Sequence, residues 1–581
     1  METLDWMVLT CTLIFIVVYG VYKTQGSSNV EEYIKGGNTS KWWTVGLSVM
    51  ATQASAITFL STTGQGFYSG MGFVQFYFGL PIAMVIICMV FIPIYHKLKV
   101  YTAYEYLESR FDLKTRSLAA VIFLIQRSLA AGITIYAPAI ILSAVLGWDL
   151  TTLNIAIGIV VIVYTVSGGT KAVSVTQKQQ MGVIFLGMFI AFYYILKQLP
   201  ESINFTKALE IAGGGDRMQL LDFSFDLDNR YTVWTGLIGG TFLMLSYFGT
   251  DQSQVQRYLA GKNVREMQLG MIFNGMLKVP MQFFILLVGV MVFVFYQFNS
   301  APLHFNPEAE EAVRNSEYAA QYKEIETRLD QVERYQKAAA FNYAKDQQLD
   351  VYDRDGETIS WMGYYLDQNR ALREEAKTLI AKAAPEAETN DKDYVFIHFI
   401  LNNLPRGLVG LLLAVILSAA MSSTASELNA LGSTTAIDLY KRNVKTDKDQ
   451  NHYVKATKGF TLMWGVLAII VACTASLFEN LIELVNIIGS IFYGTVLGIF
   501  VLAFFIRYVK SNAVFVAALI SQLLIIGIFY FAIFRIKQNG GEPLLSYLWL
   551  NFLGCVITVA LALIIQLLSK NSKPSSAQLS I

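Results

Sequence analysis

The chain has 581 residues, of which 54% are hydrophobic and only 15% are charged, and its formal net charge is +1. Soluble domains carry about 25% charged residues, so this composition predicts a polytopic membrane protein. The small net charge gives no indication of a nucleic-acid partner. The sequence also lacks a nucleotide-binding loop, a serine-hydrolase motif and a zinc-protease motif. We therefore expect neither an enzyme nor an ATP-driven pump.

Apolar runs long enough to cross ~30 Å of hydrocarbon follow one another along the chain. The thirteen predicted spans lie near residues 4–22, 43–65, 72–95, 118–146, 152–167, 179–197, 231–256, 267–298, 408–437, 456–477, 480–506, 512–534 and 545–568. Lysine and arginine are concentrated in alternate loops, which predicts an outside N-terminus and a cytoplasmic C-terminus. The expected location is the plasma (cytoplasmic or inner) membrane, crossed many times.

The second and seventh spans are each interrupted by polar residues. Thr52, Gln53 and Ser55 break the second span, and residues 249–252 break the seventh. Each break would open a five-span unit, the first at 42–200 and the second at 231–298 and 394–506. Interrupted helices at matching places in two halves indicate a transporter with a midplane binding site. The physical reason is that an unwound turn frees carbonyl oxygens for a desolvated cation.

Three further segments complete the predicted organisation. Residues 1–25 form a leading transmembrane helix, and residues 507–581 form two accessory spans and a short cytoplasmic tail. Residues 299–393 are a polar insertion on the extracytoplasmic side. Apolar residues step by four and three through 318–332, which predicts an amphipathic helix, and 366–384 are expected to form a second.

The ninth span changes character part-way along. Residues 408–421 are almost entirely apolar, whereas Ser422, Ser423 and Ser426 then place hydroxyl groups at helical spacing. Hydroxyls at this depth serve either as contacts between packed helices or as oxygen ligands on a substrate or ion path. This span alone leaves both interpretations open.

Motifs over nearly the whole chain outside the insertion resemble the sodium:solute symporter family. They are ATQASAITFLS, TAYEYLESRF, IYAPAIIL, TVSGGTKAV, DQSQVQRYL and SAAMSSTASELNALGSTTAIDLY. The resemblance implies an all-α LeuT-type 5+5 inverted repeat with an extra N-terminal span, and sodium as the coupling ion. It also implies a principal sodium site made of the backbone oxygens of Ala51, Ala54 and Ala419 and the hydroxyls of Ser422 and Ser423.

A second sodium site is predicted to be degenerate. Family members with such a site carry an aspartate in the sixth span, where this chain has Gln177 followed by Lys178. Ala425 replaces one hydroxyl of that site, while Ser426 remains. Loss of the carboxylate removes the strongest ligand for a desolvated cation, which predicts one sodium per solute. Lys178 is either a fixed substitute for the ion or an interfacial lysine that extends towards the cytoplasm.

Substrate-binding candidates come from the family resemblance and from polar residues within apolar spans. They are Gln53, Ser55, Thr58, Tyr77, Arg127, Tyr247, Lys278, Glu483 and Asn486. Tyr247 and Lys278 match sugar-carrying members of the family, whereas IYAPAIIL and DQSQVQRYL resemble the branch that carries monocarboxylates, vitamins and iodide. The resemblance is therefore to more than one branch.

Two of these candidates bear on the charge of the solute. Arg127 lies within the fourth span, where it either binds a substrate carboxylate, as in sialic-acid-type members, or pairs with a carboxylate such as Asp251 or Glu483. Glu483 and Asn486 are one helical turn apart, and they either hold a hydroxyl or an amine or form a polar patch between packed helices.

The predicted function is sodium-coupled import of a small polar organic solute by alternating access. The solute would be a sugar or polyol, or a sugar acid or monocarboxylate. The alternative is a sodium-independent or sensor-type protein of the same fold. A channel is disfavoured because one crossing stripe of hydroxyls forms no ring of ligands. The expected partners are the solute and the lipid bilayer, and nothing indicates an obligate protein partner.

Overall fold

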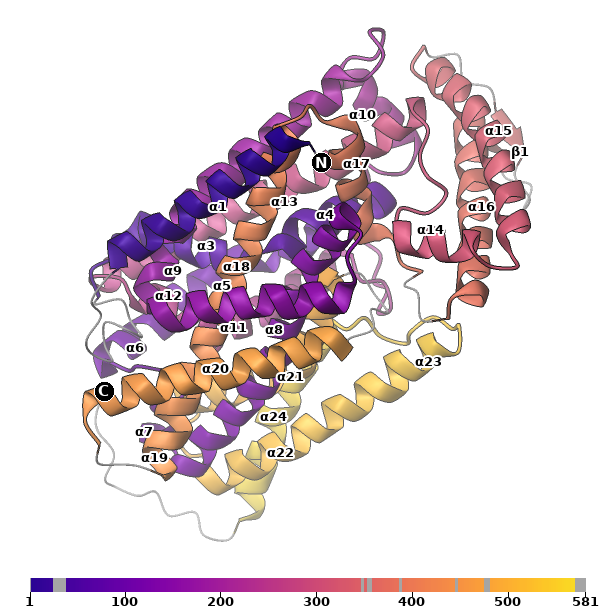
Figure 1. Cartoon of the computed structure of the whole chain (residues 1–581). Coiled ribbons are helices and arrows are strands. Elements are labelled where there is room, and N and C mark those ends of the chain that lie inside the picture. Colours follow the sequence, from indigo (N-terminus) through magenta and orange to yellow (C-terminus); the bar gives the residue numbers. More distant parts are fainter. Residues whose placement is uncertain are drawn as a thin grey trace.

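The computed structural model describes residues 2–24, 38–345, 350–352, 358–385, 389–444, 448–474 and 481–569. In this part of the chain, nine helices are long and apolar enough to cross a membrane, and Thr3–Phe15, Leu150–Val163 and Thr235–Gly249 are shorter apolar helices. The fold is all-helical apart from one small antiparallel sheet, β1 (Asp350–Tyr352) and β2 (Thr358–Ser360). Figure 1 shows the long helices packed into one bundle.

The first half of the bundle begins with a helix that lies along its outer surface (Figure 1). Its elements are α1 (Thr3–Thr24), α3 (Trp42–Gln53), α4 (Ala56–Ser69), the 3₁₀ segment η1 (Gly70–Tyr77), α5 (Gly79–Ile86), the π-helical turn η2 (Ile87–Phe91), α6 (Ile92–Leu98), α7 (Glu105–Arg110), α8 (Leu113–Leu146), α9 (Leu150–Lys197) and α10 (Phe205–Gly214). The helix α9 is continuous and contains two apolar stretches, Leu150–Val163 and Gln179–Lys197, where two spans are predicted.

The second half repeats the pattern of an interrupted helix followed by long ones. Its elements are η3 (Thr235–Gly239), α11 (Gly240–Gly249), α12 (Gln252–Leu259), α13 (Val264–Phe298), η4 (Lys392–Tyr394), α17 (Val395–Asn403), α18 (Leu408–Thr434), η5 (Thr435–Tyr440), α19 (Lys441–Asn443), α20 (Gln450–Thr474) and α21 (Leu481–Phe505). The accessory elements are α22 (Ser511–Ile528), η6 (Phe529–Phe534), α23 (Arg535–Gln538) and α24 (Trp549–Leu568), of which α22 and α24 pack against α21.

Both predicted interruptions are present. The helix α3 ends at Gln53 and α4 begins at Ala56, with Ser55 in an extended conformation between them. The helix α11 ends at Gly249, and Asp251 caps the start of α12 by accepting a hydrogen bond from the amide of Ser253 at 2.9 Å. A helix end leaves its last carbonyls without helical partners. Hydroxyls of Tyr95 and Tyr104 donate to two carbonyls at the second break, those of Gly249 and Thr250.

Close backbone contacts hold the first interrupted helix in place. A side chain at Gly289 of α13 would lie 2.1 Å from the carbonyl oxygen of Thr63, and one at Gly66 of α4 would lie 2.4 Å from that of Leu286. Only glycine allows α4 and α13 to approach so closely, as small residues do between membrane helices. The helix α18 packs against α1, α3, α8, α9 and α20, so it lies at the centre of the bundle.

The insertion between α13 and α18 forms a separate helical layer beside the bundle (Figure 1). It contains α14 (Pro307–Arg314), α15 (Ala319–Tyr343) and α16 (Trp361–Ala383). Residues of α15 and α16 that include Tyr322, Ile325, Leu329, Leu372 and Ile380 share a small hydrophobic core. This core follows the predicted step of four and three.

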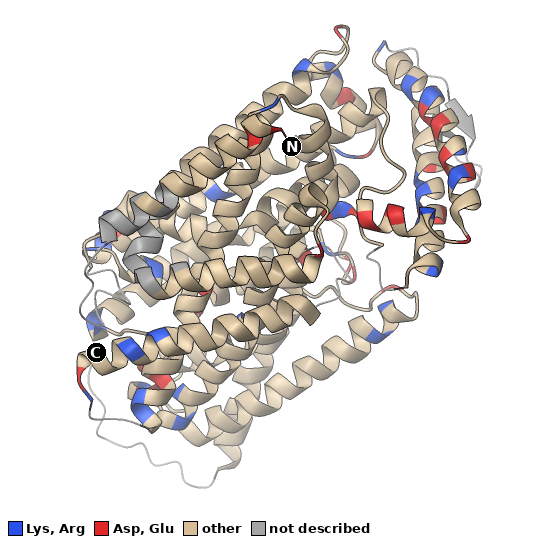
Figure 2. Cartoon of the chain, viewed as in Figure 1, with Lys and Arg blue, Asp and Glu red and all other residues tan. Residues whose placement is uncertain are grey.

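Charged residues are concentrated at the two ends of the molecule, and the middle is nearly free of them (Figure 2). At the end opposite the insertion, Arg116 of α8 pairs with Asp438 at 2.6 Å and with Glu108 at 2.8 Å. Arg442 also pairs with Glu108. These ion pairs connect α7 and α8 to the C-terminal end of the α18–η5 helix.

Candidate solute and sodium sites

A cavity of about 90 Å³ lies beside the break between α3 and α4. Its walls come from this break, η1, α8, α11, α18 and α21, and its lining residues are Thr52, Gln53, Ser55, Ile57, Thr58, Phe76, Tyr77, Arg127, Thr134, Leu243, Met244, Tyr247, Ser423, Glu427, Ile482, Val485, Asn486 and Tyr493. The structure thus brings together every predicted substrate residue except Lys278 and Glu483. Segments that are far apart in the sequence meet here because both interrupted helices pack near α18.

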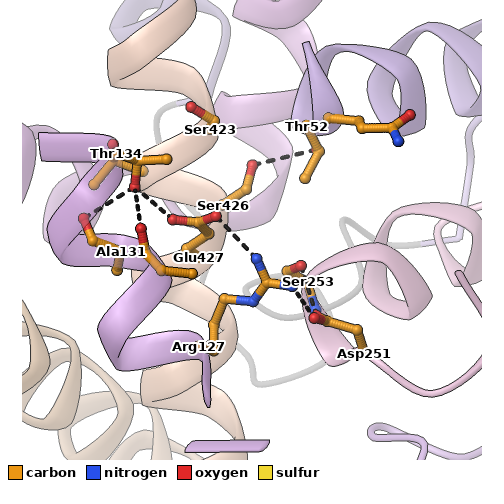
Figure 3. A network of polar contacts seen from close by, with 12 residues as sticks. Thr52, Arg127, Ala131, Thr134, Asp251, Ser253, Ser423, Ser426 and Glu427 are labelled. Carbon is orange, nitrogen blue, oxygen red and sulfur yellow. Dashed lines mark hydrogen bonds and ion pairs between the residues drawn. The ribbon is translucent and has the colours of Figure 1, made fainter. Parts of the chain in front are cut away.

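Arg127 is the centre of a buried ion network in this cavity (Figure 3). Its guanidinium group pairs with the carboxylates of Asp251 and Glu427, the latter at 3.0 Å, and donates to the hydroxyl of Tyr493 at 2.6 Å. The side chain of Arg127 is only 3% exposed. The sequence suggested that Arg127 either binds a substrate carboxylate or pairs with a carboxylate of the protein. In the structure Arg127 pairs with Asp251, as suggested, and with Glu427 in place of Glu483.

The two carboxylates differ in how fully their oxygens are used. Each carboxylate oxygen of Asp251 accepts two hydrogen bonds. Oδ1 accepts from the amide and the hydroxyl of Ser253, and Oδ2 accepts from Arg127 and from the hydroxyl of Tyr493. Glu427 accepts one bond on each oxygen, from Arg127 and from the hydroxyl of Thr134 at 2.7 Å. One guanidinium and two carboxylates give the network a formal charge of −1.

Two predicted substrate residues, Lys278 and Glu483, do not line this cavity. Glu483 accepts a hydrogen bond from the hydroxyl of Tyr231 at 2.7 Å and pairs with Arg230 at 3.0 Å, so its carboxylate is directed towards the loop before η3. Asn486, one turn further along α21, does line the cavity.

Lys278 is fully buried in α13, and its ammonium group has no hydrogen-bond partner among the described residues. Asn274 and Gln282, one turn before and one turn after it, contact Met84 and the hydroxyl of Tyr77, respectively. Residues spaced by four share one helix face. This face of α13 therefore looks onto α5 and η1, and not into the cavity.

The residues of the predicted principal sodium site lie where α18 passes the first break. Ser423 lines the cavity, and its hydroxyl donates to the carbonyls of Ala419 and Ala420, at 3.1 Å each. The hydroxyl of Ser422 is buried and has no hydrogen-bond partner in the described structure. Ala51 and Ala54 are buried at the end of α3. A buried hydroxyl without a partner in the described structure fits a cation that prefers neutral oxygen ligands.

The predicted second site is occupied by a neutral side chain of the protein. The carboxamide of Gln177 is fully buried, accepts from the hydroxyl of Ser48 at 2.6 Å, and donates to those of Thr52 at 3.1 Å and Ser426 at 3.3 Å. These contacts join α3, α9 and α18. The amide nitrogen faces the oxygens that would otherwise be available to an ion. Ala425 is buried without adding a ligand, and the side chain of Lys178 lies outside the described part of the structure.

Four polar cavity residues are absent from the sequence-based set of candidates, and one of them, Thr52, was assigned only to the break in the second span. Glu427 follows Ser423 by four residues on α18, so its place on the same helix face could have indicated it. Thr134 and Tyr493 lie on α8 and α21 within runs of mostly apolar residues. No local pattern distinguishes them, and only the packing of α8 against α18, and of α21 against α8 and α11, brings them to the cavity.

Comparison with known proteins assigns the chain to a family. Residues 33–322 and 364–521 match the model of the "Sodium:solute symporter family". The chain belongs to this family. It is accordingly an integral, multi-pass membrane protein and a transporter, not an enzyme, and sodium is the coupling ion of the family. The resemblance found in the motifs is thus confirmed.

Several curated relatives of this symporter carry different solutes by name. Sodium-coupled monocarboxylate transporter 1 from Xenopus laevis is 27% identical over 510 residues, which cover 87% of this chain and 68% of the relative. The human sodium/iodide cotransporter is 32% identical over 273 residues, which cover 47% of this chain and 42% of the relative. The sodium/sialic acid symporter SiaT from Proteus mirabilis is 24% identical over 544 residues, 91% of this chain and 90% of the relative.

A solved structure shows the same fold. It is described as the substrate-bound outward-open state of a Na⁺-coupled sialic acid symporter with a novel Na⁺ site. The superposition covers 98% of this chain and 99% of the solved chain, with a TM-score of 0.72 and 21% sequence identity. This similarity supports the LeuT-type fold predicted for the symporter, and at this identity it shows the fold alone.

Proposed function

We propose that this symporter imports a small polar organic solute together with sodium, by alternating access. The observation that carries the proposal is the break between α3 and α4, which lies beside the cavity together with the hydroxyl of Ser423 of α18. Sodium held at the break and solute held in the cavity would stabilise the same arrangement of the helices. The coupling between two such sites is reciprocal, so each would raise the affinity for the other.

The proposal includes a membrane topology and a sodium site. We place thirteen crossings in the bilayer, with the N-terminus outside, the insertion 299–393 on the same side and the C-terminus in the cytoplasm. The two inverted repeats are 42–200 and, interrupted by the insertion, 231–298 with 394–506. The sodium ligands are the backbone oxygens of Ala51, Ala54 and Ala419 and the hydroxyls of Ser422 and Ser423.

Uptake into proteoliposomes tests the function. The purified chain is reconstituted with an imposed inward sodium gradient, and uptake of radiolabelled candidate solutes is compared with uptake under an equal potassium gradient. We expect uptake that depends on sodium. Equal uptake under both gradients would favour the sodium-independent alternative. Sodium binding to the purified protein without any accumulation of solute would favour a sensor.

We further propose one sodium per solute, because the predicted second site would contain the neutral carboxamide of Gln177, which bonds to Ser48, Thr52 and Ser426. Gln177→Asp combined with Ala425→Ser is expected to restore two ligands there and to raise the Hill coefficient for sodium from near one to between one and two. The measurement is the sodium dependence of initial uptake rates. Gln177→Glu serves as the control, because it adds the charge with a longer side chain and without the hydroxyl. A wild-type stoichiometry of two sodium ions per solute would show that this reasoning is wrong.

The sequence suggested two solute classes, a sugar or polyol and a sugar acid or monocarboxylate. The structure supports the sugar acid or monocarboxylate less well. Arg127 was the candidate for binding a substrate carboxylate, but two carboxylates of the protein already pair with it. Burial of a third carboxylate beside a network of formal charge −1 would be opposed by several kcal/mol. The choice of solute therefore depends on the remaining charge of the cavity wall.

A further inference from the structure

The cavity wall carries one carboxylate whose charge the protein balances only in part. Asp251 shares Arg127, receives four hydrogen bonds and caps the N-terminus of α12, where the helix dipole favours a negative charge. Glu427 shares the same guanidinium and, among the residues that the structure describes, has only Thr134 as a further partner. Each oxygen of a carboxylate can accept two bonds. Glu427 lines the cavity, so it is the group with unused acceptor capacity towards a solute.

Aromatic side chains form much of the remaining wall. Phe76, Tyr77, Tyr247 and Tyr493 all line the cavity. The hydroxyl of Tyr77 accepts from the amide of Gln282 at 2.9 Å, and that of Tyr247 accepts from the amide of Gln254 at 2.6 Å. These bonds fix the positions of the two rings. Aromatic rings attract cations, most strongly where water is excluded, and cages of such rings recognise ammonium groups.

We propose that the cavity selects a small solute with an ammonium group, and that a net-neutral zwitterion fits it best. The ammonium group would donate to Glu427 among the four rings. This inference rests on the proposed sodium-coupled function and names the class of solute for the same cavity. The assignment differs from the solutes in the names of the relatives, which are monocarboxylates, iodide and sialic acid.

The charge balance of the site supports the zwitterion over the other classes. The Arg127 network contributes −1 and one bound sodium contributes +1, so a net-neutral solute leaves the site neutral. An anionic solute would leave −1, and a simple amine would leave +1. A neutral diol also leaves the site neutral, but it brings no positive group to Glu427.

Probes that differ only in charge test this assignment. The three-carbon series is alanine, alaninol, lactate and 1,2-propanediol, and the five-carbon series is valine, valinol, 2-hydroxyisovalerate and 3-methyl-1,2-butanediol. Binding to the purified full-length protein is measured by thermal shift and by calorimetry, with sodium and with potassium. In at least one series we expect the zwitterion to bind at least tenfold more tightly than the hydroxy acid in sodium, with the amine between them.

Glu427→Gln provides the second measurement. The amide keeps an acceptor for Arg127 and the contact with Thr134, but it loses the charge that faces the cavity. We expect affinity for the zwitterion and the amine to fall at least tenfold, while sodium alone still raises the melting temperature. Glu375→Gln is the matched control, because Glu375 is an exposed partner of Arg328 in the insertion. That variant is expected to bind all probes as the wild type does.

The outcomes separate this inference from the proposed function. Tightest binding of the hydroxy acid or the diol, unchanged zwitterion affinity in Glu427→Gln, or a sodium-induced shift without binding of any ammonium-bearing probe would each overturn the ammonium assignment while leaving sodium coupling in place. If sodium changes neither the melting temperature nor the probe affinity of the wild-type protein, the proposed function is overturned, and this inference with it.

Discussion

Replacing Arg127 by glutamine is expected to lower the free energy of unfolding by about 3–5 kcal/mol, because the substitution leaves two buried carboxylates without their shared counter-charge. Asp251 and Glu427 both pair with Arg127, and both are almost completely buried. The loss should appear as a lower melting temperature of the detergent-solubilised protein and a lower yield of monodisperse material. This is the largest effect that we expect from a single substitution in the chain.

Two control variants define the origin of this effect. Arg328→Gln removes an exposed ion pair with Glu375, and it should cost no more than about 1 kcal/mol. Combining Arg127→Gln with Asp251→Asn and Glu427→Gln removes all three charges and should recover most of the lost stability. If Arg127→Gln alone melts at the wild-type temperature, the network does not stabilise the fold, and Arg127 is again a candidate for binding a substrate carboxylate.

Replacing Ser422 and Ser423 together by alanine is expected to shift the sodium dependence of uptake at least tenfold towards higher concentration. A hydrogen-bonding group that contacts a charge contributes about 1.5–3 kcal/mol, and 1.4 kcal/mol corresponds to a factor of ten in affinity. Two of the five proposed sodium ligands would be lost. The measurement is the sodium concentration for half-maximal uptake, supported by sodium-induced changes in tryptophan fluorescence of the purified protein.

The matched control for the serine pair is Thr424→Val on the same helix. The hydroxyl of Thr424 donates to the carbonyl of Ala420 at 2.9 Å. The residue is buried, and it is not one of the five proposed sodium ligands. Valine has nearly the same shape, so this variant should keep the sodium dependence of the wild type. Unchanged sodium activation in the double alanine variant would place the sodium ion elsewhere in the protein.

Much of the fold follows from local sequence patterns. Apolar runs of spanning length predicted the long helices, because a membrane-crossing segment must satisfy its own backbone and bury few charges. Polar residues within the second and seventh spans predicted both helix breaks, since Gly249 and Asp251 favour a helix end and a helix start, respectively. The family resemblance and the polar residues within apolar spans together identified most of the polar residues that line the cavity.

Tertiary packing alone decided how the charges of the site are used. Arg127, Asp251 and Glu427 lie on three different elements, α8, the α11–α12 break and α18, and their pairing depends on how those elements cross. Neither helical periodicity nor motif spacing carries information on such a crossing. The same holds for Lys278 and Glu483, which both lie in the predicted spans but are directed away from the cavity by the rotation of α13 and by Arg230.

The sequence by itself therefore determined the class of the protein, its interrupted helices and the family to which it belongs, because these depend on hydrophobicity and on motifs that are contiguous in the chain. Only the tertiary structure decided that the carboxamide of Gln177 bonds to Thr52 and Ser426 and that Glu427 gives the cavity wall an excess negative charge. The physical reason is that the net charge of a buried site is a sum over residues from several helices, and a sum of that kind is defined only once the helices are packed together.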